Sequence, residues 1–82
     1  MLNDKTGNLL DAKTVGKIIR RYRENKGVSQ EVVSGLADIG RTHLSAIERG
    51  ERKPTMETFC KICSALEIKS STVLKVIEEE SE

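Results

Sequence analysis

Cys60 and Cys63 have the Cys-x-x-Cys spacing that can serve metal or redox chemistry. A tetrahedral zinc site needs four nitrogen or sulfur ligands, and the sequence adds no further cysteine and only one histidine, His43. Both cysteines fall on or beside an apolar stripe with helical spacing, where a thiol acts as a small hydrophobic side chain. We therefore expect core cysteines, no metal site and no cofactor.

His43 is also the one histidine available for general acid–base catalysis. No nucleophile and orienting carboxylate stand in a recognisable pattern around it, and the chain has no glycine-rich phosphate loop and no paired carboxylates. The sequence therefore predicts that the protein is not an enzyme.

Positive charge is concentrated in the middle of the chain. Residues 13–53 hold ten Lys/Arg against five Asp/Glu, whereas residues 54–82 hold three against six. The net charge of +1 conceals this separation. A basic face that meets a polyanion would explain it, but charged helix faces are often only solvated. Charge alone leaves both interpretations open.

Five segments repeat apolar residues at the i, i+3, i+4 spacing of a helix. Asp11 or Thr14 is expected to begin the first, Ser29 to cap the second and Gly50 to end the third, which runs from Arg41 to Arg49. In chain order, the apolar residues of the five segments are Val15, Ile18, Ile19 and Tyr22; Val33, Leu36 and Ala37; Leu44 and Ile47; Phe59, Ile62, Cys63 and Leu66; and Val73, Leu74, Val76 and Ile77. No useful alternating strand pattern occurs, so the predicted fold is all-α with five helices.

A short turn, residues 38–40, separates the second and third helices. It suits helices that cross steeply, with Ile39 filling the corner between them and with Asp38 and Gly40 tolerating the turn geometry. The turn therefore predicts a helix-turn-helix.

The third helix would then present small or forked polar side chains outward. Arg can bond guanine through two donors, and Thr offers a hydroxyl and a methyl, so a helix of this kind suits the DNA major groove. The outward residues are Arg41, Thr42 and Ser45, with His43 and Ala46 as further candidates. Arg49, Arg52 and Lys53 could lie against phosphates, and Gln30 could bond a phosphate or brace a base-reading neighbour.

The runs Val28–Ser34 and Ile39–Thr55 resemble the Cro and phage-repressor (XRE-type) helix-turn-helix family, with its Ser-Gln-Glu opening and Ile-Glu-Arg-Gly ending. The resemblance covers residues 15–77 and implies a five-helix, lambda-repressor-like domain that regulates transcription. Stand-alone proteins of this length resemble restriction–modification controllers, phage repressors and small antitoxins. Val33, Ser34, Gly35 and Gly40 depart from the family pattern, which predicts a weaker second helix.

The resemblance also implies roles for individual residues. It places Gln30, Arg41, Thr42, His43 and Ala46 near bases or flanking phosphates, and Ser29, Arg49 and Lys53 near the DNA backbone. It further implies a structural ion pair between Arg23 and Glu48 beneath the recognition helix.

Residues 1–12 are expected to form a partly ordered arm and residues 13–82 the helix-turn-helix domain. No apolar run is long enough for a membrane span or a signal core, which predicts a cytoplasmic protein. Apolar residues spread around the last helix predict a homodimer on a palindromic operator. The alternative is an antitoxin-type protein-interaction module, with the acidic residues 78–82 binding a protein partner and with secondary DNA binding.

Overall fold

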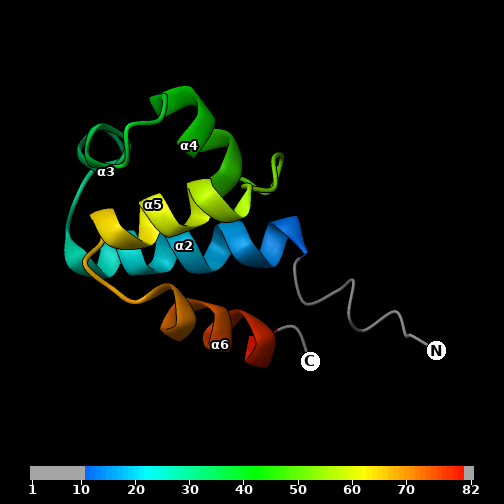
Figure 1. Ribbon diagram of the computed structural model, residues 1–82. Helices are drawn as coiled ribbons and strands as arrows, with labels where there is room; N and C mark the ends of the chain where they lie inside the picture. The colour runs from blue at the N-terminus through cyan, green and yellow to red at the C-terminus, as the bar shows by residue number, and fades with distance from the viewer. Residues whose placement is uncertain (1–10, 81–82) are drawn as a thin grey trace.

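The structure, a computed structural model, describes residues 11–80 and is all-α over that range. Its helices are α2 (Ala12–Lys26), α3 (Gln30–Ala37), α4 (Arg41–Glu48), α5 (Met56–Ala65) and α6 (Ser70–Glu80). Figure 1 shows α4 and α6 on opposite sides of α2, and both contact it. The predicted fold class and the five helices are confirmed.

Local polar contacts fix the start and end of α2. An Asp11 carboxylate oxygen accepts the backbone N–H of Thr14 at 3.1 Å, which identifies Asp11 as the N-cap. Gly27 ends the helix in the left-handed region, with φ at 76°. Asp11 and Ala12 thus belong to the start of α2. The rest of the expected arm, residues 1–10, lies outside the described residues.

The core is aliphatic apart from Phe59 and Cys63, and it draws on every helix of residues 11–80. Its buried members are Val15, Ile18, Ile19, Val33, Ala37, Leu44, Ile47, Phe59, Ile62, Cys63, Leu66, Val73 and Ile77. Tyr22, Leu74 and Val76 pack at its edge and are partly buried. None of the helices between residues 11 and 80 has the length and apolar character needed to cross a membrane.

Leu36 departs from the predicted core, because its side chain is 68% exposed. The buried face of α3 is formed by Val33, Ser34 and Ala37, and Leu36 lies about 100° around the helix from the centre of that face. Ser34 can be buried because its hydroxyl donates to the carbonyl oxygen of Glu31 at 3.1 Å.

The two cysteines also differ from each other. Cys63 is buried as expected, and burial raises the pKa of its thiol to about 12 because the thiolate would lose its hydration. The expectation of a core position is wrong for Cys60, which is exposed. Cys60 follows Phe59 by one residue, so the helix turns it away from the buried face, and its thiol lies 3.8 Å from the hydroxyl of Ser70.

Gly16 allows α2 to approach the end of α4 very closely. A Cβ atom at this position would lie 2.1 Å from the carbonyl oxygen of Ile47 and 2.8 Å from that of Glu48. Both are backbone atoms, which cannot rotate away as a side chain can. The crossing of these two helices therefore depends on the absence of a side chain at residue 16.

Gly16→Ala should destabilise the domain by about 1–3 kcal/mol, because the added methyl group must separate the two helices. Gly35→Ala is the matched control: Gly35 also lies within a helix, but an added Cβ there meets no atom within 4 Å. It should stabilise the domain by about 0.5–1 kcal/mol, since alanine loses less entropy in a helix. Urea unfolding measures both, and equal effects of the two substitutions would contradict the close approach.

Candidate nucleic-acid interface

The turn between α3 and α4 bends the chain as the sequence predicts. Asp38 adopts the left-handed conformation with φ at 58°, and the backbone N–H of Ile39 donates to the carbonyl oxygen of Ser34 at 3.0 Å. Ile39 is partly buried against the core. Gly40, with extended backbone, is the residue before α4. The bend therefore ends α3 with a satisfied backbone and starts a new helix in another direction.

One side of α4 is fixed in the core and the other is free for contact. Leu44 and Ile47 are fully buried. Thr42, Ser45, Ala46 and the following Arg49 share the opposite face, because they are spaced at i, i+3, i+4 and i+7. Thr42 and Arg49 are exposed, whereas Ser45 and Ala46 are half-buried. Arg41 is exposed at the first position of the helix, and His43, two residues later, is half-buried.

A buried ion pair joins α2 to the end of α4. The Arg23 guanidinium donates through Nε to Glu48 Oε2 at 2.7 Å and through Nη2 to Oε1 at 3.0 Å. The Glu48 side chain is only 2% exposed and that of Arg23 12%. The hydrogen bond to Glu48 raises the pKa of Arg23 above its ordinary value, against the opposing effect of burial. The ion pair that the family resemblance implied is therefore present.

Two further contacts connect this pair to the turn before α3 and to the first residue of α3. Arg23 Nη1 donates to the carbonyl oxygen of Val28 at 2.8 Å, and Gln30 Nε2 donates to Glu48 Oε1 at 2.9 Å. Gln30 is thus half-buried and bonded to the structural pair, whereas the sequence predicted a bond to a phosphate or to a base-reading neighbour. Ser29 is exposed, and its hydroxyl accepts the backbone N–H of Val32 at 3.1 Å, which confirms it as the cap of α3.

Arg49 is held by its own chain. Its Nε and Nη2 donate to the two carboxylate oxygens of Glu51, each at 3.0 Å, and its Nη1 donates to the Ser45 hydroxyl. The hydrogen bonds of this pair raise the pKa of Arg49 and lower that of Glu51. Two residues predicted to face DNA, Ser45 and Arg49, are therefore brought together with the carboxylate of Glu51, which was not among the predicted site residues.

Most basic residues between positions 13 and 53 are paired with acids elsewhere in the protein. The pairs are Lys17 and Arg21 with Glu80, Arg20 with Glu24, Arg23 with Glu48, Lys26 with Glu67, and Arg49 with Glu51. Within residues 11–80, Arg41, Arg52, Lys53 and Lys13 form no ion pair. All four of these cations belong to α4, to the loop after it, or to the part of α2 that meets this loop.

Lys13 was not among the predicted site residues. It lies against Gly50, since a Cβ at that glycine would be 2.9 Å from the Cα of Lys13. This neighbourhood follows from the close crossing of α2 and α4 at Gly16. No local spacing in the sequence could have shown it, because the two residues are far apart along the chain.

The comparisons with known proteins agree with this geometry. A helix-turn-helix family model matches residues 19–73. The chain belongs to the XRE-type helix-turn-helix family. It is 37% identical over 62 residues to the transcriptional regulator ClgR of Mycobacterium tuberculosis, an alignment that includes 76% of this chain but only 55% of ClgR. This chain therefore spans about half the length of that relative.

Two solved structures of restriction–modification controller proteins have the same fold. C.AhdI from Aeromonas hydrophila is 30% identical with a TM-score of 0.74, over 77% of this chain and 96% of the controller. A C.Esp1396I tetramer, solved in complex with its natural 35 base-pair operator, is 29% identical with a TM-score of 0.79, over 89% and 93% of the two chains. The family and the lambda-repressor-like fold expected from the sequence are confirmed, whereas the individual site residues stay predictions.

Glu48→Ala should reduce the free energy of unfolding by about 3–5 kcal/mol, because it leaves the mostly buried Arg23 guanidinium without its partner. The control is Glu24→Ala, which removes an exposed ion pair with Arg20 on α2 and should cost less than about 1 kcal/mol. Chemical denaturation followed by circular dichroism measures both variants. Similar losses would show that the buried pair contributes no more than a surface one.

Proposed function

We propose that this protein is a transcriptional regulator that binds double-stranded DNA at specific sequences through α4. The observation that supports this most strongly is where the cations that form no ion pair within residues 11–80 are located. Arg41 stands at the start of the exposed α4 face, and Arg52 and Lys53 stand just past its end. The other basic residues of the segment, apart from Lys13, are neutralised by acids. Positive charge is thus left where a phosphate backbone would flank an inserted helix.

In this proposal α4 enters the major groove with its N-terminal end towards the bases. Its eight residues make a rod about 12 Å long, comparable to the width of the groove. Arg41 and Thr42 read base edges, because both are exposed at the first two positions of the helix. The half-buried residues His43, Ser45 and Ala46 contribute shape and short-range contacts without keeping the helix away from the bases.

The flanking residues position the protein on the duplex. Arg52 and Lys53 hold phosphates after α4, and Lys13 adds a third cation beside them through its contact with Gly50. Ser29 and Gln30 approach the backbone at the start of α3, with Gln30 also fixed by Glu48. A regulator of this kind acts where the genome is, which in a bacterium is the cytoplasm. We therefore expect this protein to act in the cytoplasm.

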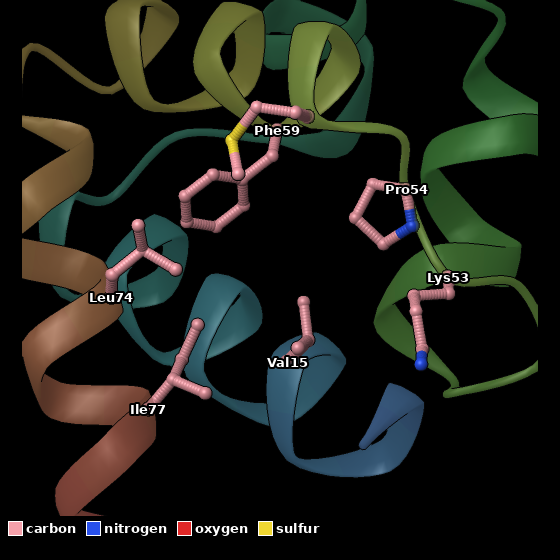
Figure 2. Close-up of a pocket in the computed structure, with 7 residues that line it drawn as sticks. Val15, Lys53, Pro54, Phe59, Leu74 and Ile77 are labelled. Carbon is pink, nitrogen blue, oxygen red and sulfur yellow. The ribbon is translucent and has the colours of Figure 1, made fainter. Parts of the chain in front are cut away.

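A symmetric dimer on a palindromic operator completes the proposal. The C.Esp1396I tetramer in complex with its operator supports the assembly of several subunits of this fold on DNA. In this chain, a mostly apolar hollow of about 200 Å³ opens between α2, α5, α6 and the loop before α5. It is lined by Val15, Lys53, Pro54, Phe59, Leu74 and Ile77 (Figure 2). Met56 also lines it and is 60% exposed. A second subunit that covers this face would bury the apolar residues of α6 that remain partly exposed.

The antitoxin-type alternative has weaker support. It relied on the acidic C-terminal residues to bind a protein partner, but Glu80 already pairs with Arg21 at 3.1 Å and with Lys17 at 3.7 Å on α2. Val32 and Leu36, one turn apart and exposed on α3, are the feature that would favour a protein contact. High-affinity DNA binding by the purified chain alone would favour the regulator.

Arg41→Ala should weaken binding to the preferred operator by about 1–3 kcal/mol and leave binding to random duplex nearly unchanged, because a base contact carries sequence information. Lys53→Ala should weaken both equally and reduce the slope of log affinity against log salt by about 0.9, since one phosphate contact is lost. The exposed Lys69→Ala is the control and should change neither affinity.

These affinities can be measured by fluorescence anisotropy at several salt concentrations, with an operator selected from a pool of random duplexes. Equal losses for Arg41→Ala on the operator and on random DNA would contradict the reading role of that residue. Failure of the wild-type protein to prefer any sequence would refute the proposed function itself.

Met56→Glu should weaken self-association at least about tenfold, because it places a charge on the face proposed for the dimer. Leu36→Glu makes the same kind of change at a residue that is even more exposed, on α3, and should leave association unchanged. Sedimentation equilibrium measures both. A wild-type chain that stays monomeric at high concentration, or equal effects of the two variants, would contradict a dimer through this face.

A further inference from the structure

We propose that Glu51 is a specificity-determining residue of the α4 interface that acts through Arg49, an inference that rests on the proposed DNA-binding function. Glu51 holds the guanidinium of Arg49 through both carboxylate oxygens, at 3.0 Å each. Its role is to keep this cation from binding phosphates indiscriminately while leaving part of it free for a base.

The hydrogen-bond donors of Arg49 are divided between the protein and its surroundings. A guanidinium has five N–H donors. Glu51 takes the one on Nε and one on Nη2, and the Ser45 hydroxyl takes one on Nη1. One donor therefore remains on each terminal nitrogen. Since Ser45 and Arg49 share the exposed face of α4, these two donors are held at the surface that DNA is proposed to meet.

The carboxylate then discriminates between two kinds of acceptor. A phosphate that approaches Arg49 meets a cation already neutralised at 3.0 Å and is repelled by the negative charge of Glu51. The acceptor atoms of guanine in the major groove carry no net charge, so they lose less from this repulsion. Glu51 thus weakens contacts that every sequence offers more than contacts that only the operator offers.

Other positive charges near Arg49 already attract any DNA duplex, which is why the restraint by Glu51 matters. Arg52 and Lys53 follow directly and form no ion pair within residues 11–80, and Lys13 lies against the adjacent Gly50. One more free cation at Arg49 would further strengthen binding to any duplex. The Arg49–Glu51 pair limits this nonspecific attraction without removing the arginine.

Glu51→Gln tests the proposal, because the amide keeps the size of the side chain and removes its charge. Binding to random duplex should become about fivefold tighter, and the salt slope should steepen by about 0.9, as one more phosphate contact becomes available. Operator binding should tighten less, so that the ratio of operator to random affinity falls. Glu24→Gln, which makes the same charge change in an exposed pair on α2, should leave the ratio unchanged.

A second comparison shows whether Glu51 acts through Arg49. In the Arg49→Gln background, Glu51→Gln should change random-duplex affinity and salt slope by much less than it does in the wild type. If the effect persists unchanged there, or if Glu51→Gln alone strengthens operator and random binding equally, Glu51 is only a repulsive surface charge and the proposal is wrong.

The outcomes also separate this inference from the proposed function. A wild-type preference for an operator that Glu51→Gln does not reduce overturns only the role of Glu51. A wild-type protein with no sequence preference, and no loss on Arg41→Ala, overturns the proposed function and this inference with it. Unchanged helicity and melting temperature of Glu51→Gln by circular dichroism would show that the variant is folded.

Discussion

The buried contact between Arg23 and Glu48 is the constraint on which the rest of this small domain depends. Two charges removed from water lose their hydration, so their hydrogen-bonding groups need partners within the protein. Here the guanidinium donates two hydrogen bonds to the carboxylate, and Val28 and Gln30 add one each. One interaction thereby connects α2, the start of α3 and the end of α4. Because it requires defined geometry from each element, it fixes the orientation of the exposed helix more strictly than apolar packing alone.

The close contact at Gly16 acts together with this ion pair. The glycine lets the backbones of α2 and α4 meet, and the pair, seven residues further along α2, holds the same helices by their side chains. Packing also brings Lys13 beside the loop after α4. The surface chemistry of the proposed interface is therefore set by how two helices cross, and not only by the residues of α4.

Much of this organisation could be predicted from the sequence, because it depends on local periodicity and on caps. The five helices, the bend at Asp38 and the inward positions of Leu44 and Ile47 all follow from patterns within a few turns. The predicted core positions of Leu36 and Cys60 are wrong, because both side chains are exposed. A short helix offers too few residues to fix the centre of its buried face. Periodicity does not encode where side chains meet. It therefore could not predict the long-range ion pair of Glu80 with Arg21 or the ion pair of Arg49 with Glu51.

Because α6 and α4 are attached to α2 by different kinds of contact, the two sides of the molecule differ in their sensitivity to ionic strength. Glu80 connects the end of α6 to Lys17 and Arg21 through solvent-exposed charges, whereas α4 is attached through a contact sheltered from water. Dissolved ions weaken the first kind of attraction far more than the second. A rise in ionic strength would thus loosen the last turn of α6 while α4 keeps its orientation on α2, so the face proposed for the dimer is more sensitive to salt than the placement of the proposed recognition helix.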